Sequence, residues 1–341
     1  MIIHSKAPLR LGLAGGGTDV SPFSEDFGGA VLNTTISLYA RAVIEPLDNG
    51  KIILESFDLD EYQELKSNTY LASDGKLPLL KGVYNRIVSD FVKRPLSFKL
   101  TTIVDVPKGS GLGTSSTIVV AILGAFVEWL NLPLGDYDIA HLAWEIERKD
   151  LNLAGGKQDQ YAATFGGFNF IEFSAGENVI VNPLRIKNLY KLQLEWNLLL
   201  YYTGTGRDSA DIIRDQSRGF EDKGSNAVSA AQAIKEISYS MKETLLRGDI
   251  DNIGNLLDIS WQNKKKMSKE ITNPVLDEIY DTALKAGANG GKISGAGGGG
   301  FIMFYCPANT KQKVIKELNR FGGRAYNYVF VDDGLITLTV K

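Results

Sequence analysis

The chain has 341 residues, which at about 150 residues per domain suggests two domains. Its hydrophobic fraction of 44% and charged fraction of 23% are those of an ordinary globular protein, and they exclude a disordered chain, a collagen and a disulfide-rich scaffold. Lys and Arg number 37 against 40 Asp and Glu, and the resulting net charge of -3 gives no electrostatic basis for binding nucleic acid.

The cysteine content and the N-terminal sequence bear on the cellular compartment in which the protein is expected. The single cysteine, Cys306, cannot form a disulfide within the chain, which favours a reducing environment. The N-terminal segment lacks the apolar run of a signal peptide, and the sequence lacks a stretch of about 18 apolar residues that would predict a membrane-spanning helix. We therefore expect a cytoplasmic protein without membrane partners.

Strand-like and helical segments are mixed in the first half of the chain. Short apolar or β-branched segments bounded by Gly, Pro, Asn or Asp predict strands at 6–13, 30–36, 40–45, 52–56, 96–104, 167–173 and 179–182. Apolar residues at helical spacing predict helices at 79–92, 137–149 and 158–164. The run that begins at Ser115 is apolar nearly all round, which predicts a buried helix.

The second half of the chain is also mixed. The same patterns predict strands at 196–202, 301–305, 325–330 and 335–340, and helices at 208–216, 226–247, 250–267, 273–285 and 310–320. Asn273 is a suitable N-cap, with Pro274 at the first helical position. Strands and helices in both halves predict an α+β fold rather than an alternating parallel sheet, with a domain boundary between 182 and 195.

The strongest local signal is the glycine-rich segment 107–116, which follows a predicted strand and opens the buried helix. Glycines allow backbone N–H groups to turn toward an anion, and the free amides of a helix N-terminus favour phosphate. The segment lacks the lysine of a Walker A loop and the G-x-G-x-x-G spacing of a dinucleotide fingerprint. The alternative is a tight turn with a serine N-cap.

Two further glycine clusters occur near the ends of the chain. Residues 292–300 separate a predicted helix from a strand, and glycine at this density indicates a close approach of backbone to backbone or to a ligand. The alternative is a flexible connector. Residues 10–19 end a strand in a glycine turn that carries Asp19, which by itself is typical of an exposed turn.

Together the three clusters resemble the GHMP small-molecule kinases, a superfamily that includes galactokinase, homoserine kinase, mevalonate kinase and phosphomevalonate kinase. Segment 107–116 is similar to their P-x-x-x-G-L-G-x-S-S loop, and 292–300 to their K-x-S-G-A-G-x-G-G loop. Segment 7–19 is similar to the N-terminal motif that galactokinases use on their sugar. Its GGGTD ending resembles the D-glycero-D-manno-heptose 7-phosphate kinases and related fucokinase domains, as do segments 28–33, 155–160 and 202–204.

The resemblance implies a two-domain α+β architecture. Residues 1–190 would form an N-terminal half like the second domain of ribosomal protein S5, which carries the phosphate loop 107–116. Residues 191–341 would form a ferredoxin-like C-terminal half, which carries the glycine-rich loop 292–300.

The resemblance also implies ATP and Mg²⁺ as ligands. The implied ATP contacts are Pro107, Lys108, Gly109, Ser110, Gly111, Leu112, Gly113, Thr114, Ser115, Ser116, Gly295 and Gly297. Members of the family hold magnesium on a Ser and a Glu that match Ser116 and Glu147, and oxygen ligands suit this cation. Glu145 is a weaker candidate because it lies on a different face of the predicted helix.

Asp159 matches the aspartate that is the proposed base in galactokinase and mevalonate kinase, although this chain has one extra residue between the Glu-Arg pair and this Asp than mevalonate kinase has. A base there would accept the proton of the attacking hydroxyl. Arg10 matches the basic residue that faces it. An N-cap is the alternative for Asp159. The implied sugar contacts are Asp19, Gly17, Thr18, Gly156, Thr203 and Arg207.

The implied reaction is ATP-dependent phosphorylation of the anomeric hydroxyl of D-glycero-D-manno-heptose 7-phosphate to the 1,7-bisphosphate, in nucleotide-activated heptose biosynthesis. The 7-phosphate needs cations, for which Arg207 and Arg214 are candidates and Lys81 and Arg86 weaker ones. Alternatives are an L-fucokinase or another free-sugar 1-kinase, and a non-catalytic regulator that binds nucleotide and sugar. A homodimer is an additional expectation.

Overall fold

The strand-forming segments assemble into two sheets. The structure is a computed structural model that describes residues 1–176, 178–206 and 209–341. Within these residues the larger sheet has eight strands, in the order β12-β1-β2-β5-β3-β4, with β6 and β7 branching from β2. The smaller sheet of the described chain has four strands, in the order β11-β8-β10-β9. Paired strands are antiparallel except β3 and β5, and helices accompany both sheets, so the predicted α+β class is confirmed.

Strand β2 joins most of the large sheet, because it pairs with β1 along its length, with β5 at one end and with β6 at the other. The sheet consists of β1 (Ile2–Ala14), β2 (Gly29–Pro46), β3 (Lys51–Ser56), β4 (Glu61–Lys66), β5 (Phe98–Val104), β6 (Phe168–Phe173), β7 (Val179–Pro183) and β12 (Ile336–Val340). The prediction of two separate strands at 30–36 and 40–45 is wrong. A register shift opposite Pro8 and Leu9 leaves the intervening residues inside one bulged strand.

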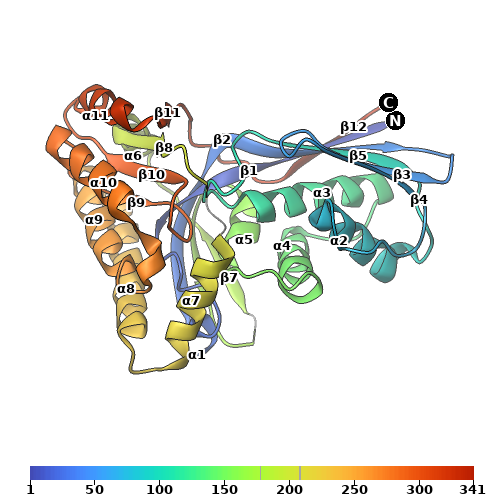
Figure 1. Ribbon diagram of the computed structural model, residues 1–341, viewed down its shortest axis with the longest axis horizontal. Coiled ribbons are helices and arrows are strands. Elements are labelled where there is room, and N and C mark those ends of the chain that lie inside the picture. The colour runs from blue at the N-terminus through green and yellow to red at the C-terminus, as the bar shows by residue number, and fades with distance from the viewer. Residues whose placement is uncertain (177, 207–208) are drawn as a thin grey trace.

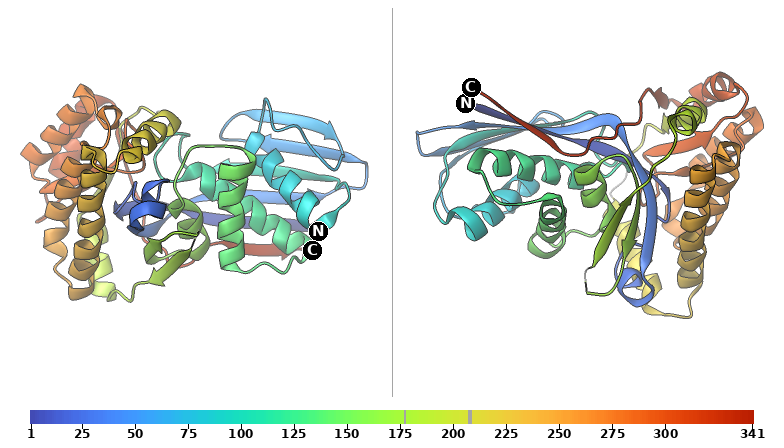
Figure 2. Two further views of the ribbon diagram at one scale, coloured as in Figure 1. Left: turned by 90° about the horizontal axis from the view of Figure 1, so that it is seen from below. Right: turned by 180° about the vertical axis from the view of Figure 1, so that it is seen from behind.

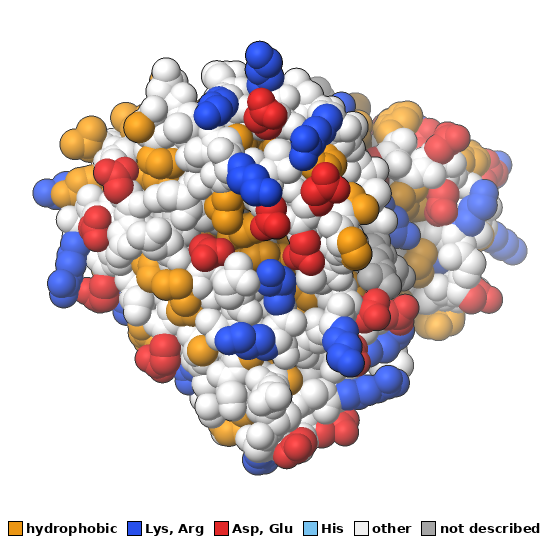
Figure 3. All heavy atoms as spheres, turned by 60° about the vertical axis from the view of Figure 1, so that its left-hand side comes forward, with side chains coloured by type: hydrophobic (Ala, Val, Ile, Leu, Met, Phe, Trp, Pro, Cys, Tyr) orange, Lys and Arg blue, Asp and Glu red, His pale blue; other side chains and the backbone are white. Residues whose placement is uncertain are grey.

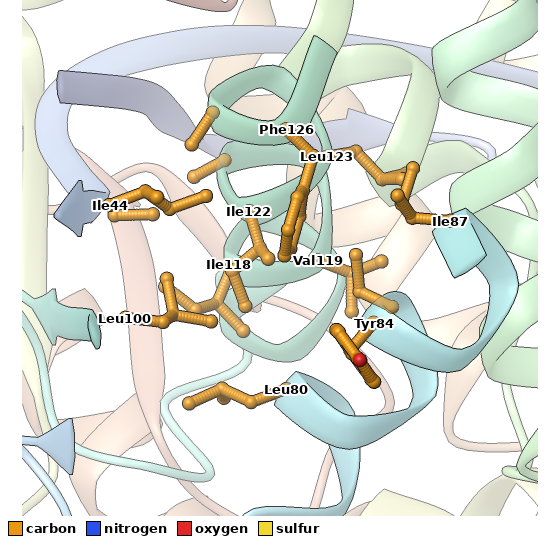
Figure 4. Close-up of a cluster of buried hydrophobic side chains, with 14 of the residues drawn as sticks. Ile44, Leu80, Tyr84, Ile87, Leu100, Ile118, Val119, Ile122, Leu123 and Phe126 are labelled. Atoms are coloured by element: carbon orange, nitrogen blue, oxygen red, sulfur yellow. The ribbon is translucent and has the colours of Figure 1, made fainter. Parts of the chain in front are cut away.

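Four helices and two π-helical turns cover one face of the large sheet (Figures 1 and 2). They are α2 (Pro78–Ile87), the turn Val88–Val92, α3 (Thr114–Leu130), α4 (Asp136–Glu145), the turn Ile146–Asp150 and α5 (Gln158–Phe165). Figure 4 shows that α3 supplies the centre of this core, with Ile122 and Phe126 packed between sheet residues such as Ile44 and helix α2. Burying such a side chain contributes about 1.5–3 kcal/mol relative to its exposure. We call this sheet and these helices the large-sheet unit.

The remaining helices pack around the four-stranded sheet and form the small-sheet unit (Figure 1). Its elements are α6 (Asn188–Asn197), β8 (Leu198–Tyr202), α7 (Ser209–Glu221), α8 (Asn226–Arg247), α9 (Ile253–Lys264), α10 (Pro274–Ala286), β9 (Gly290–Ile293), β10 (Phe301–Tyr305), α11 (Lys311–Leu318) and β11 (Arg324–Tyr326), with 3₁₀ turns at Ile250–Asn252, Lys269–Ile271 and Asn319–Phe321. As predicted, Asn273 caps α10 by accepting a hydrogen bond from the N–H of Leu276. The short helix α1 (Phe23–Phe27) packs on this unit through Phe23 and Phe220.

Strand β9 was not predicted from the sequence, because two of its four residues are glycines with low strand propensity. The structure requires both glycines. A Cβ atom on Gly290 would lie 1.9 Å from the carbonyl oxygen of Gly254 in α9, and one on Gly291 would lie 2.4 Å from that of Met303 in β10. The strand is therefore held by close backbone packing instead of by side chains. Strand β4 and helix α6 were also missed.

The two ends of the chain lie together in the large sheet (Figures 1 and 2). Strand β12 pairs antiparallel with β1, with Ile2 opposite Val340 and Lys6 opposite Ile336. The expected C-terminal half 191–341 therefore does not end in its own unit, because its last strand completes the sheet of the first. Local sequence pattern predicts the strand but not its partner, which is more than 300 residues away.

Figure 3 shows Lys and Arg interspersed with Asp and Glu over the face that carries the C-terminal helices, with neither sign forming a continuous patch on that face. Among the described helices, none has the length and hydropathy needed to cross a membrane.

Candidate active site

Three glycine-containing loops meet where the two units join. The segment between β5 and α3 lies against the segment between β9 and β10, and the N–H of Phe301 donates to the carbonyl of Ser110 at 2.9 Å. The loop after β8 joins them, since the N–H of Gly300 donates to the carbonyl of Thr205 at 2.8 Å. A Cβ atom on Gly300 would lie 2.4 Å from the oxygen of Ser110. Segment 292–300 is therefore a close backbone contact, and the flexible-connector alternative does not describe it.

The segment before α3 presents backbone amides and a free hydroxyl. Gly109, Gly111 and Gly113 all have positive φ, and Gly113 is the N-cap of α3 without a side-chain cap. The serine-capped turn is therefore not what forms. The Oγ of Ser110 is buried and has no hydrogen-bond partner among the described residues. Uncapped amides at a helix N-terminus are suited to bind the phosphates of a nucleotide. Lys108 is exposed at the start of this segment.

Arg10 and Asp159 come together at the centre of the site. Arg10 Nε donates to Asp159 Oδ1 at 2.7 Å, and Arg10 Nη1 donates to the carbonyl of Gly111 at 2.7 Å and to Ser294 Oγ at 3.2 Å. The guanidinium therefore holds the carboxylate and both glycine loops. A Cβ atom on Gly113 would lie 3.0 Å from Asp159 Cγ, so the carboxylate lies directly beside the start of α3.

Ser116 and Glu147 also come together, and a third residue links them. The amide of Gln160 donates to Ser116 Oγ at 3.0 Å and to Glu147 Oε2 at 2.5 Å. Glu147 is fully buried, and its Oε1 and the Oε1 of Gln160 have no hydrogen-bond partner among the described residues. The nearest cation to Glu147 Oε1 is Arg148, whose Nη1 lies 3.8 Å away. Buried oxygens without hydrogen-bond partners beside a hydroxyl are a donor set that fits Mg²⁺. The sequence pattern did not single out Gln160, although it follows Asp159 directly.

Asp19 is buried and faces the start of α5. Its Oδ2 accepts from the N–H groups of Lys157 and Gln158 at 3.0 and 3.1 Å, and its Oδ1 accepts from the N–H of Gly17 and the amide of Gln158. These bonds fill the acceptor positions of a carboxylate. A sugar hydroxyl would bind Asp19 only by displacing one of them. In the described contacts Asp19 positions α5, the helix that carries Asp159.

The other predicted sugar contacts divide into three groups. Thr18 and Thr203 are buried, and their hydroxyls donate to the carbonyls of Gly15 and Gly300, so neither has a hydroxyl directed at a ligand. Gly17 and Gly156 allow close approach, since a Cβ atom on Gly156 would lie 1.9 Å from Asp19 Oδ2. Arg207 lies outside the described residues.

The weaker candidates for binding the distal phosphate are engaged elsewhere. The amine of Lys81 donates to the carbonyl of Asp74, and Arg86 forms ion pairs with Glu145 and Asp150. Glu145 also pairs with Lys149, so its described contacts are with surface cations and not with Ser116. None of these contacts joins Lys81, Arg86 or Glu145 to the Arg10–Asp159 pair.

Two buried lysines complete the site and were not predicted. Lys264 Nζ donates to the carbonyl of Gly295 at 2.6 Å, and Lys292 Nζ donates to the carbonyl of Gly12 at 2.8 Å. Burial lowers the pKa of Lys264 to about 8, against the opposing charge of Asp19. Burial also lowers the pKa of Lys292, and the charge of Lys264 lowers it further. One feature of the sequence could have identified Lys264 as buried, namely its position on the inward face of a helix.

In α9 the buried positions recur every three or four residues, and the last of them is Lys264. An amphipathic helix normally places apolar residues there, so a lysine at that position marks a charge that the fold directs inward.

Comparison with known proteins gives the context of this geometry. Residues 78–167 match the family described as GHMP kinases N terminal domain, and residues 241–324 match GHMP kinases C terminal. The D-glycero-alpha-D-manno-heptose 7-phosphate kinase of Campylobacter jejuni is 49% identical over 98% of both chains. A crystal structure described as a D-glycero-D-manno-heptose 1-phosphate kinase from Bacteroides thetaiotaomicron is 45% identical, with a TM-score of 0.86 over 99% of both chains.

A bifunctional protein of Bacteroides fragilis, named L-fucokinase/L-fucose-1-P guanylyltransferase, is more distant. It is 27% identical over 92% of this chain, which corresponds to 35% of that protein. The similarity to the two heptose kinases is therefore higher in identity and covers 98% or more of both chains.

Proposed function

This chain belongs to the GHMP kinase family, and we propose that it transfers the γ-phosphoryl group of ATP to the anomeric hydroxyl of D-glycero-D-manno-heptose 7-phosphate, giving the 1,7-bisphosphate and ADP. The observation that carries the proposal is the Arg10–Asp159 pair beside the phosphate loop, in a chain 49% identical to a heptose 7-phosphate kinase. An L-fucokinase has less support, since that relative is 27% identical.

Asp159 is the proposed general base. Arg10 binds its Oδ1, which leaves Oδ2 to accept the proton of the C1 hydroxyl as the oxygen attacks phosphorus. The carboxylate is partly exposed, with 23% of its side-chain surface accessible, so a hydroxyl can reach it. Intact Arg10 and Asp159 also argue against the non-catalytic regulator, since such a protein has no use for a paired base.

The segment 107–116 is the proposed phosphate site, with Gly295 and Gly297 on its opposite side. Backbone amides and Ser110 Oγ would bind the β- and γ-phosphates, and the ammonium of Lys264 would neutralise charge on the transferred group. Ser116 and Glu147 would hold Mg²⁺, with Gln160 adjacent. The metal would shield phosphate charge during transfer. We also propose that the protein takes part in nucleotide-activated heptose synthesis, is cytoplasmic and forms a homodimer.

The test is a substrate panel with the purified protein, ATP and Mg²⁺. We expect heptose 7-phosphate to be phosphorylated with the highest kcat/KM among heptose 7-phosphate, the free heptose, L-fucose and galactose. Mass spectrometry and phosphorus NMR should locate the new phosphate on C1. A higher kcat/KM for L-fucose, or a product phosphorylated elsewhere, would replace this proposal with the free-sugar kinase.

A further inference from the structure

A hollow of about 380 Å³ lies between α7 and the segment that connects α4 to α5. It is lined on one side by Arg148 and residues 153–155, and on the other by residues of α7 that include Arg214 and Arg218. Figure 1 shows α7 near the junction of the two units. The hollow therefore crosses from the large-sheet unit to the small-sheet unit, as a substrate cleft would.

The charge of this hollow is of one sign. Three arginines line it, and none of its described lining residues is Asp or Glu. Arg214 and Arg218 are four residues apart on α7 and so share a helix face. Arg214 pairs with the exposed Asp211 at 3.0 Å, whereas Arg218 has no ion-pair or hydrogen-bond partner among the described residues. Arg148 is more engaged, because its Nη1 lies 3.8 Å from Glu147 Oε1 and donates to the carbonyl of Leu153. The guanidinium of Arg218 is thus available to an anionic ligand, and that of Arg214 becomes available when the ligand displaces an exposed aspartate.

The hollow adjoins the loop that leads into α5, the helix that carries Asp159. Val20 and Ser21, which line it, follow Asp19 in the chain, and Gly155 precedes Gly156, whose Cα lies against the Asp19 carboxylate. Arg148 Nε and Nη2 both donate to the carbonyl of Gly156 at 3.3 Å. Gly155, which lines the hollow, lies three residues before the start of α5 at Gln158, and Asp159 is the second residue of that helix.

A second hollow provides a contrast. It is larger, about 970 Å³, and it lies on another side of α7, where Lys265, Lys266 and Lys269 line it together with Asp215 and Glu270. Because its charges are mixed, it lacks the electrostatic preference for a dianion that the arginine hollow has.

We propose that the hollow formed by Arg148, Arg214 and Arg218 binds the phosphate at the non-reacting end of the acceptor sugar, and so selects sugar phosphates over free sugars. The inference rests on the proposed function and extends it to named residues. Guanidinium groups bind phosphate oxygens through paired hydrogen bonds, which a lysine cannot reproduce. This position also places the two ends of the sugar in different units, with C1 at Asp159 and the phosphate against α7.

The test compares heptose 7-phosphate with the unphosphorylated heptose in wild type, Arg214→Ala, Arg218→Ala and the double variant. We expect the ratio of kcat/KM for the phosphorylated over the free sugar to fall on the order of 10²-fold in the double variant. Arg218→Lys should recover only part of the ratio. Arg247→Ala is the matched control, because Arg247 is an exposed helix arginine paired with Glu243. Calorimetry with heptose 7-phosphate, without ATP, should show the same loss of affinity.

Several results would overturn the inference. An unchanged ratio in the double variant would exclude the hollow, and an equal fall for both sugars would show that α7 matters only for general architecture. A raised KM for ATP with an unchanged ratio would assign the arginines to the nucleotide. Failure of the proposed function is distinguishable, because wild-type enzyme would then show no preference for the phosphorylated heptose before any arginine is changed.

Discussion

The carboxylate of Asp159 and the guanidinium of Arg10 lie 2.7 Å apart, although 149 positions separate the two residues in the chain. The same guanidinium donates to Gly111 in the phosphate loop and to Ser294 in the C-terminal glycine loop. Arg10 therefore couples the position of the proposed base to the contact between the two units. Movement of either loop would change the distance between the base and the phosphate site.

Replacing the proposed base should reduce turnover and leave nucleotide binding intact. We expect Asp159→Asn to lower kcat on the order of 10²-fold or more, since general-base catalysis typically contributes 10²–10⁴. The dissociation constant for ATP, measured by calorimetry, should stay close to that of wild type. Asp332→Asn is the control, because Asp332 is an exposed carboxylate outside the site. Lost ATP affinity in a folded Asp159→Asn protein would contradict the assignment.

The oxygen cluster at Ser116 and Glu147 can be tested by magnesium titration. Ser116→Ala and Glu147→Gln should each raise the magnesium concentration needed for half-maximal activity, because each removes a hard oxygen ligand. Glu145→Gln serves as the control, since Glu145 pairs with Arg86 and Lys149 at the surface. If both site variants titrate like wild type, neither residue is a ligand.

The residues that could be predicted from sequence are those in short motifs. Glycines at fixed spacing before a buried helix identified segment 107–116 as a phosphate site, because this motif is local. The roles of Ser116 and Asp159 came from matching them to the family. The geometry of the pair with Arg10 followed from the family resemblance and not from spacing.

The parts that were missed depend on contacts between distant segments. The sequence does not show that Lys264 is buried, because its burial depends on contacts with Gly16 and Gly295, which are distant in the chain. Arg218 lines one hollow together with Arg148, which lies in the other unit, and the sequence does not show that the two are neighbours. Strand β12 pairs with β1 across the whole chain. No local periodicity encodes such pairings, since hydrophobic pattern specifies which face is buried and not what covers it.

The contact between the glycine loops can be tested by comparing alanine variants of two glycines, one inside the contact and one outside it. Gly300 and Gly322 have similar positive φ values of 82° and 76°, but a Cβ atom on Gly300 meets Ser110 at 2.4 Å whereas one on Gly322 meets nothing within 4 Å. Both alanine variants carry the backbone strain of a left-handed residue. We expect Gly300→Ala to be less stable than Gly322→Ala by about 1–3 kcal/mol, and to raise the KM for ATP. Equal denaturation midpoints and equal KM values would show that the loops tolerate separation.

Lys264 should make activity sensitive to alkaline pH. Its pKa of about 8 means that the ammonium loses its proton as pH rises through that value, and with it the charge placed beside the phosphate site. We expect kcat/KM of the wild type to fall across this range, since kcat/KM reports groups of the free enzyme. Lys264→Arg, which keeps its charge, should not show this fall, and Lys264→Met should have low activity at every pH. Lys265→Met, at the next and more exposed position, is the control.

Stability gives an independent test of the same amine, with a defined sign. Lys264 has a pKa of about 8 in the folded protein and an ordinary value of 10.5 when unfolded, so between these values the unfolded chain binds more protons. The titration of Lys264 therefore makes the free energy of unfolding of the wild type rise with pH across this window. The Lys264→Met variant has no such contribution. Urea denaturation at pH 7.5, 9 and 10 should show the difference between wild type and Lys264→Met growing in favour of wild type, because the cost of burying the charge disappears as the amine becomes neutral. A constant difference would mean that Lys264 titrates near its ordinary value, and the fall in activity would then need another group.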